Sequence, residues 1–203
     1  PAKIMPGQKL NLNKPIYFII EPSFSTGCPP NTKDHMACMA GRLAKLRAGI
    51  DDWLKHFAKP SRPRMIILSS QHPVPSNAIN YPIHISIEKD GCMLGSPKTK
   101  YDACYREDLD LPRIIFDEPK KITIPTSSHE LGHALGLKHR ASDSIMSFRE
   151  RNIVQPIDII TLCELHQECP AHDTTWCEGS FYSSCRCPST SFEASERKNN
   201  ACE

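Results

Sequence analysis

The sequence predicts an α/β (α+β) fold, in which a twisted, mostly parallel sheet is covered by a long backing helix. Three observations favour this class: a strand, a helix and a second strand follow one another early in the chain, further β-branched runs come after them, and a later segment carries closely spaced histidines. With 203 residues, the chain suits one domain and an appendage, and its 39% hydrophobic content is enough for a core.

The early strand, helix and strand form the first unit of the expected sheet. Residues 16–20 are an aromatic and β-branched run that ends before Pro22, and residues 65–68 are a second apolar run. A right-handed crossover between the two runs makes them parallel strands. The helix between them carries one continuous apolar stripe, and Pro60 and Pro63 are expected to stop it. The stripe consists of Met39, Leu43, Leu46, Ile50, Trp53, Leu54 and Phe57.

Two further strands are expected before the histidines. Residues 83–87 alternate in polarity and predict a third strand, and residues 114–117 predict a fourth. Residues 90–110, between these strands, contain glycine, proline and several charges, which is typical of a loop. We expect Cys92 and Cys104 to pin this loop.

The stretch HELGHALGLKH has the residue types and the spacing of a helical zinc site. Residues four apart lie on one face of a helix, so His129 and His133 can each direct a ring nitrogen at one ion. Glu130 lies beside them, where its carboxylate can reach a zinc-bound water as a general base. Gly136 can adopt a positive φ and turn the chain, which brings back His139 as a third ligand. Three protein ligands leave one position open, as catalytic zinc sites require.

An ordinary amphipathic helix is the alternative explanation of the paired histidines. In that case Ser127 and Glu130 would form a capping box at the start of the helix. Gly136 and His139 weigh against this alternative, because a chance match to the whole motif has a probability of roughly 10⁻⁵ at average residue frequencies.

The motif and the residues that follow it resemble the metzincin zinc endopeptidases, and they look most like the matrixin branch. Residues 144–147, Ser-Ile-Met-Ser, resemble the turn that carries a methionine under the metal in that family, and Met146 comes only seven residues after His139. The resemblance implies one catalytic zinc, with Glu130 as the general base and Met146 packed beneath the ligands without binding. The implied ligands are His129, His133 and His139.

The same resemblance implies where a substrate binds and which other metals to expect. The strand at 114–117 would be the edge strand beside the cleft, with an extended substrate antiparallel to it. The implied substrate-binding residues are Ile114, Ile115 and Phe116, with Phe148 in the wall after the methionine turn. Matrixins hold a structural zinc with a histidine-containing run that is absent here, so we expect no second zinc, and His72 and His84 are interpreted as surface or sheet histidines. Calcium could bind through Asp and Glu side chains, but no spaced loop such as an EF-hand supports it.

After the methionine turn, the sequence predicts one more helix and then a change of composition. Gln155 and Pro156 start the helix, with Ile159, Ile160 and Cys163 toward the core. The sequence predicts a catalytic domain, which consists of two subdomains, and a Cys-rich extension. Their bounds are 1–168 for the catalytic domain, divided into 1–136 and 137–168, and 169–203 for the disulfide-stapled extension.

Ten cysteines, dense toward the end of the chain, predict disulfides and an oxidising compartment. A zinc-knuckle tail is the alternative, but Cys185 and Cys187 lack the two-residue spacing of such knuckles. We therefore expect a secreted, extracellular protein. The start at Pro1, without the apolar region of a signal peptide, indicates a processed chain that has lost a pro-segment, as zymogens do.

The charge balance and the apolar runs exclude several classes of partner. A formal net charge of +2 with dispersed basic residues does not favour nucleic acid, and the apolar runs are too short to cross a bilayer. We expect a monomer that hydrolyses peptide bonds of proteins or peptides with a zinc-activated water and Glu130. Two alternatives remain: a secreted, zinc-containing binding or toxin-like module that acts through its Cys-rich tail, and an enzyme with one narrow target.

Overall fold

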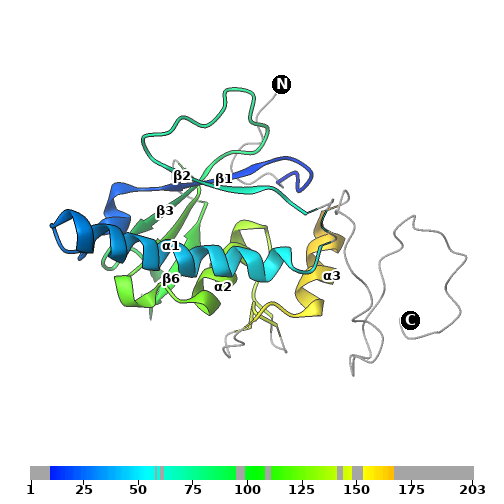
Figure 1. The fold of residues 1–203 in the computed structure, drawn as a ribbon. Coiled ribbons are helices and arrows are strands. Elements are labelled where there is room, and N and C mark those ends of the chain that lie inside the picture. The colour runs from blue at the N-terminus through cyan, green and yellow to red at the C-terminus, as the bar shows by residue number, and fades with distance from the viewer. Residues whose placement is uncertain are drawn as a thin grey trace, which may run out of the picture.

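The computed structural model describes residues 10–57, 59, 62–94, 99–107, 111–140, 144–147 and 153–166. These residues form an α/β structure around a five-stranded sheet of order β2-β1-β3-β7-β6, which confirms the predicted class (Figure 1). All neighbouring strands are parallel except β6, which is antiparallel to β7. The strands of this sheet are β1 (Ile16–Ile20), β2 (Met65–Ser69), β3 (Ile83–Ile87), β6 (Ala103–Arg106) and β7 (Arg113–Phe116).

The first strand–helix–strand unit forms as expected. Strand β1 is buried along its whole length and pairs in parallel with β2, with Ile16 opposite Met65. Helix α1 (Thr32–Leu54) lies between them in sequence, and its apolar stripe packs into the core. The expected stop at the prolines is wrong, because the helix ends at Leu54, before either proline. The amide of Phe57 turns back to the carbonyl of Leu54 at 3.1 Å, and this tighter turn places the Phe57 ring in the core.

The edge of the sheet differs from the prediction. Strand β7 lies between β3 and β6, so the run at 114–117 is an interior strand, and β6 is the edge strand on that side. The segment 90–110 was expected to be a loop, but it supplies β6 and a small hairpin of β4 (Met93–Leu94) and β5 (Thr99–Lys100). The Cys92–Cys104 disulfide joins the start of this segment to β6, as predicted. A second disulfide joins Cys28 to Cys38.

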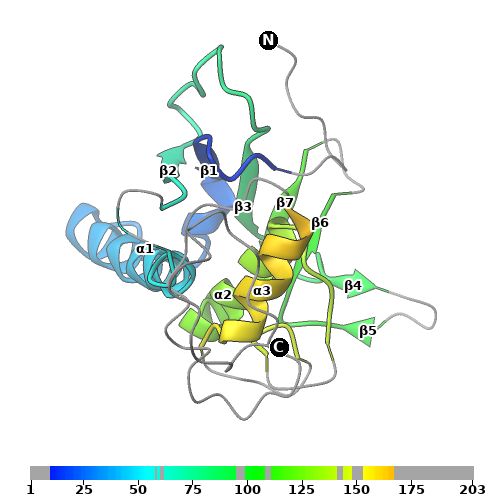
Figure 2. The same cartoon turned by 90° about the vertical axis from the view of Figure 1, so that its right-hand side faces the viewer.

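Two further helices complete the described structure. Helices α1 and α2 (Ile124–Ala134) run beside each other, and the indole nitrogen of Trp53 donates to the carbonyl of Ser128 at 2.9 Å (Figure 1). Helix α3 (Pro156–Leu165) begins with Pro156 in its first turn, as predicted, and lies at one end of α1 and α2 (Figure 2). Ile159 and Ile160 are buried.

No helix in the described part of the chain is both long and apolar enough to cross a membrane. The predicted Cys-rich extension, residues 169–203, lies outside the described residues, and the predicted subdomain boundary at residue 136 stays a prediction.

Candidate metal centre and active site

Helix α2 supplies the first two histidines and the carboxylate of the predicted site. The helix is capped by Thr123, whose hydroxyl accepts from the amide of Thr126 at 3.2 Å. Ser127 is therefore inside the helix and fully buried, so the capping-box explanation of Ser127 and Glu130 is wrong. The helix begins about one turn earlier than it would if Ser127 were its N-cap.

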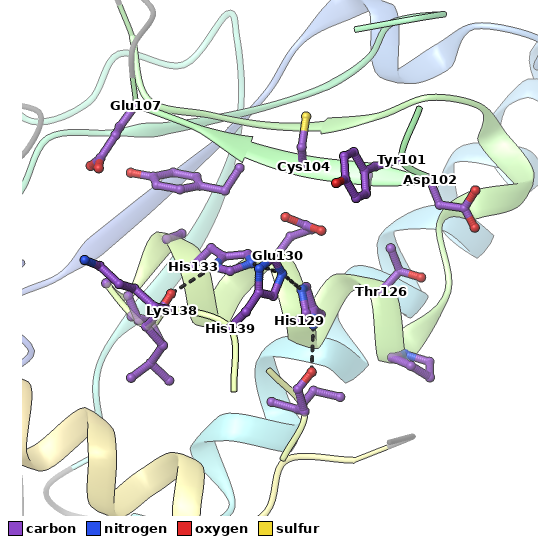
Figure 3. Close-up of a pocket in the computed structure, with 18 of the residues that line it drawn as sticks. Tyr101, Asp102, Cys104, Glu107, Thr126, His129, Glu130, His133, Lys138 and His139 are labelled. Carbon is purple, nitrogen blue, oxygen red and sulfur yellow. Dashed lines mark hydrogen bonds between the residues drawn. The ribbon is translucent and has the colours of Figure 1, made fainter. Parts of the chain in front are cut away.

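The glycine turn after α2 forms as the motif predicts. Gly136 has a φ of +98°, and its amide donates to the carbonyl of His133 at 2.8 Å. The amide of Leu137 donates to the carbonyl of Gly132 at 2.9 Å, which completes a Schellman-type helix end. Because the chain reverses here, His139 returns to the face of α2 that carries His133 (Figure 3).

The three histidines converge on one point through the same ring atom. The Nε2 atom of His139 lies 3.1 Å from Nε2 of His129 and 3.1 Å from Nε2 of His133. Ligands about 2.0–2.1 Å from a tetrahedral zinc are about 3.3 Å apart, so the spacing fits one zinc ion with little movement. Among the described residues, these histidines are the only group of three or more His, Cys, Asp or Glu side chains placed to share a metal ion.

Backbone carbonyls fix the orientation of two of the rings. Nδ1 of His129 donates to the carbonyl of Ile145 at 2.7 Å, and Nδ1 of His133 donates to that of Leu137 at 2.8 Å. With the proton held on Nδ1, each Nε2 keeps a free lone pair, which is the form that binds metal. Burial lowers the pKa of all three rings, that of His133 to about 4, so they are neutral at physiological pH.

Glu130 is a buried carboxylate with one oxygen left open. Burial raises the pKa of Glu130 to about 8, although a hydrogen bond from the backbone of Tyr105 opposes the shift. Among the described residues, its Oε2 atom has no hydrogen-bond partner. Figure 3 shows the carboxylate between the histidines and strand β6. A buried carboxylate without a full set of partners beside three converging lone pairs is an arrangement that a cation would stabilise.

Met146 packs against α2 between the first two ligands. Its side chain is fully buried, and a Cβ added at Gly132 would lie 2.2 Å from its sulfur atom. The close approach of the methionine to the helix therefore requires glycine at this position. The predicted place of Met146 beneath a metal stays a prediction.

Replacing Gly132 with alanine should therefore destabilise the protein by about 1–3 kcal/mol, the usual cost of overpacking a core. The free energy of unfolding in denaturant measures this effect. Gly41→Ala is the matched control, because Gly41 lies in α1 with nothing within 4 Å of an added Cβ. The control should gain about 0.5–1 kcal/mol, since alanine favours a helix. Equal stability of the two variants would contradict the tight packing of Met146.

A cleft of about 1160 Å³ runs between the histidines and the edge strand. Its walls are strand β6 with the residues before it on one side and α2 with the segment up to His139 on the other (Figure 3). The residues of the wall formed by β6 and the segment before it, here called the upper wall, were not predicted, because this segment was expected to be a loop. These residues are Lys100, Tyr101, Asp102, Ala103, Cys104, Tyr105 and Glu107.

The predicted substrate-binding residues do not line this cleft. Ile114, Ile115 and Phe116 are at most 1% exposed, because β7 is an interior strand and β6 separates it from the cleft. Their expected role is therefore wrong. Phe148 lies outside the described residues. The edge strand beside the cleft is β6.

A lysine holds the base of the upper wall. Nζ of Lys100 lies 2.9 Å from Oδ1 of Asp90 and 2.9 Å from Oδ2 of the buried Asp117. An ammonium group therefore lies between two carboxylates. His84 lies in β3 and bonds to Glu21, and His72 is exposed, which agrees with their interpretation as sheet and surface histidines.

A comparison of the chain with protein-family models found no match, and a comparison with curated proteins found no significant one.

Proposed function

We propose that the protein is a secreted zinc endopeptidase of the metzincin type. One observation carries the proposal: the Nε2 atom of His139 lies 3.1 Å from that of each of the other two histidines, beside the buried Glu130 and in an open cleft. A closed structural zinc site would use four protein ligands and would not need a carboxylate held outside the ligand set. The disulfides Cys28–Cys38 and Cys92–Cys104 support an oxidising compartment.

In the proposed reaction, the chain's own residues hold the metal and move a proton. The ligands are His129, His133 and His139. Zinc, when bound, would polarise the scissile carbonyl and acidify a water molecule. Glu130 takes a proton from that water and passes it to the leaving amine, a role that the position of its carboxylate between the histidines and β6 supports.

Strand β6 supports binding of an extended peptide. The amide of Asp117 donates to the carbonyl of Asp102 at 3.0 Å, so these two residues form a hydrogen-bonded pair of the antiparallel ladder. Pairs alternate along such a ladder, so the backbone groups of Ala103 and Tyr105 point away from β7. The hydrogen bond from the Tyr105 backbone to Glu130 agrees with this direction. A substrate strand can therefore pair with the free edge of β6 above the histidines.

Cleavage of a mixed peptide library by the purified, zinc-loaded protein tests the proposal. Cut sites are identified by mass spectrometry, with and without a metal chelator. We expect cuts that the chelator abolishes and that zinc restores, at bonds flanked by extended sequence.

Two other outcomes would contradict the proposed activity. Cuts that persist in chelator would point to a contaminating or metal-independent protease. A protein with one bound zinc and no cuts, even among substrates drawn from extracellular proteins, would support a binding module instead.

A further inference from the structure

Helix α3 bonds to the two turns that aim the histidines. Figure 1 shows α3 at one end of α1 and α2. The contacts of α3 lie at its beginning, its middle and its end.

The beginning of α3 holds the methionine turn through Asp158, which is fully buried. Oδ2 of Asp158 accepts from the amide of Ile145 at 3.0 Å and from that of Gln155 at 2.8 Å. Oδ1 accepts from the hydroxyl of Ser144, and that hydroxyl oxygen accepts from the amide of Met146 at 2.8 Å. The carbonyl of Ile145 is the one that orients His129.

The middle and the end of α3 hold the chain around the other ligands. Thr161 accepts from the side chain of Arg140, the residue after His139, while the amide of Arg140 donates to the carbonyl of Met146 at 3.0 Å. Just beyond the helix, Nε2 of the buried His166 donates to the carbonyl of Leu135 at 2.8 Å. This bond secures the turn that leads to His139.

Asp158 and Thr161 are three residues apart, so they lie on one face of α3, and His166 follows directly after the helix. The carbonyls that orient His129 and His133 belong to the backbone and depend on the two turns for their position. Groups that bond to metal ligands without touching the metal typically contribute about 10–100-fold to metal affinity. In this protein that role extends to the side chains that hold those carbonyls.

We propose that Asp158 and His166 are positioning residues that set the geometry of the three-histidine site before metal binds. Asp158 acts on His129 through Ile145, and His166 acts on the path to His139 through Leu135. This inference rests on the proposed zinc site and adds residues that touch neither metal nor substrate.

Metal affinity of matched variants tests the inference. Asp158→Ala and His166→Leu remove the contacts, whereas Asp158→Asn and His166→Gln keep a group that can bond to the same partners. Zinc affinity is measured by competition with a chelator on folded protein, and the free energy of unfolding is measured without metal. We expect the first pair to bind zinc about tenfold or more weakly, in the range for outer partners of metal ligands, and the second pair to bind nearly as the unchanged protein does.

Cobalt substitution gives a readout that general stability does not move. The visible bands of bound Co²⁺ depend on coordination geometry, so Asp158→Ala and His166→Leu should alter them and the conservative variants should not. Asn80→Ala is the control, because the buried Asn80 amide donates to the carbonyls of Asn11 and Pro15 far from α3. It should lower stability and leave both zinc affinity and the cobalt spectrum unchanged.

The outcomes separate this inference from the proposed function. Normal zinc affinity and an unchanged cobalt spectrum in the folded variants would overturn the inference alone. If Asp158→Ala does not fold, Ser144→Ala decides, because it removes one hydroxyl of the same chain of bonds and leaves Asp158 in place. An unchanged protein that binds no zinc would overturn the proposed function and this inference together.

Discussion

Glu130→Ala should lose peptide hydrolysis while the protein keeps its zinc. Glu130 is placed toward the cleft and outside the three converging nitrogens, so its removal takes away the proton acceptor and leaves the ligands. Positioned proton transfer typically contributes about 10²–10⁴ in rate, and we expect kcat to fall by at least this factor. Zinc content by metal analysis and turnover of a peptide identified in the library measure the two effects on one sample.

The pH dependence of the stability of the metal-free protein is a second, independent test of the burial of Glu130. Burial raises its pKa from 4.5 to about 8, so in the metal-free protein the charged form opposes folding. Metal-free protein should therefore lose stability as the pH rises from 4.5 toward 8, and Glu130→Gln should not show this loss from residue 130. If the charged carboxylate stabilised the fold, Glu130→Gln would instead be less stable than the unchanged protein.

The control for Glu130 is a carboxylate outside the cleft. Glu118 is partly exposed and pairs with Lys120, so Glu118→Ala should retain both zinc and turnover. Near-normal turnover by zinc-loaded Glu130→Ala would show that another group accepts the proton.

The features that the sequence predicts well are those with a local cause. The run at 16–20 is β-branched or aromatic at every position, and no other structure accommodates it as readily as a buried strand. The site is also local, because His129, His133 and the positive φ of Gly136 lie within a few residues on a helix and the turn after it. Such spacing determines geometry without knowledge of the rest of the chain.

The edge of the sheet has no such local cause. Strand β6 has only four residues, and periodicity over so short a stretch does not distinguish a strand from a loop. Without β6, the run at 114–117 became the apparent edge, and the wrong residues were assigned to the cleft. One signal was present: the predicted Cys92–Cys104 link requires residue 104 to lie beside the sheet.

The hydrogen bonds of α3 and His166 to the two turns could not be predicted from the sequence either. Asp158 looks like an ordinary residue in the first turn of a helix, and His166 like a histidine at its end. Their partners, Ile145 and Leu135, are distant in sequence, and only the folded chain brings them into contact. Residues that position a site from outside it therefore need the structure, even where the ligands do not.

His139→Ala should weaken zinc binding by more than about 100-fold, beyond the range seen when only an outer partner of a ligand is removed. With His139 gone, two nitrogens remain and water must take the third place. The His139 side chain is exposed. The free energy of unfolding of the metal-free variant should therefore lie within about 0.5 kcal/mol of that of the unchanged protein. Zinc affinity by chelator competition and metal-free unfolding together separate loss of a ligand from loss of the fold.

His72→Ala is the matched control for His139→Ala, because His72 is an exposed histidine that bonds to Ser69 in a turn outside the cleft. It should bind zinc as the unchanged protein does. If His139→Ala kept full affinity, the third ligand would have to come from another residue, and the close approach of its Nε2 to His129 and His133 would have no role in metal binding. Because the glycine turn serves to return His139, such a result would also leave the positive φ of Gly136 without a functional reason.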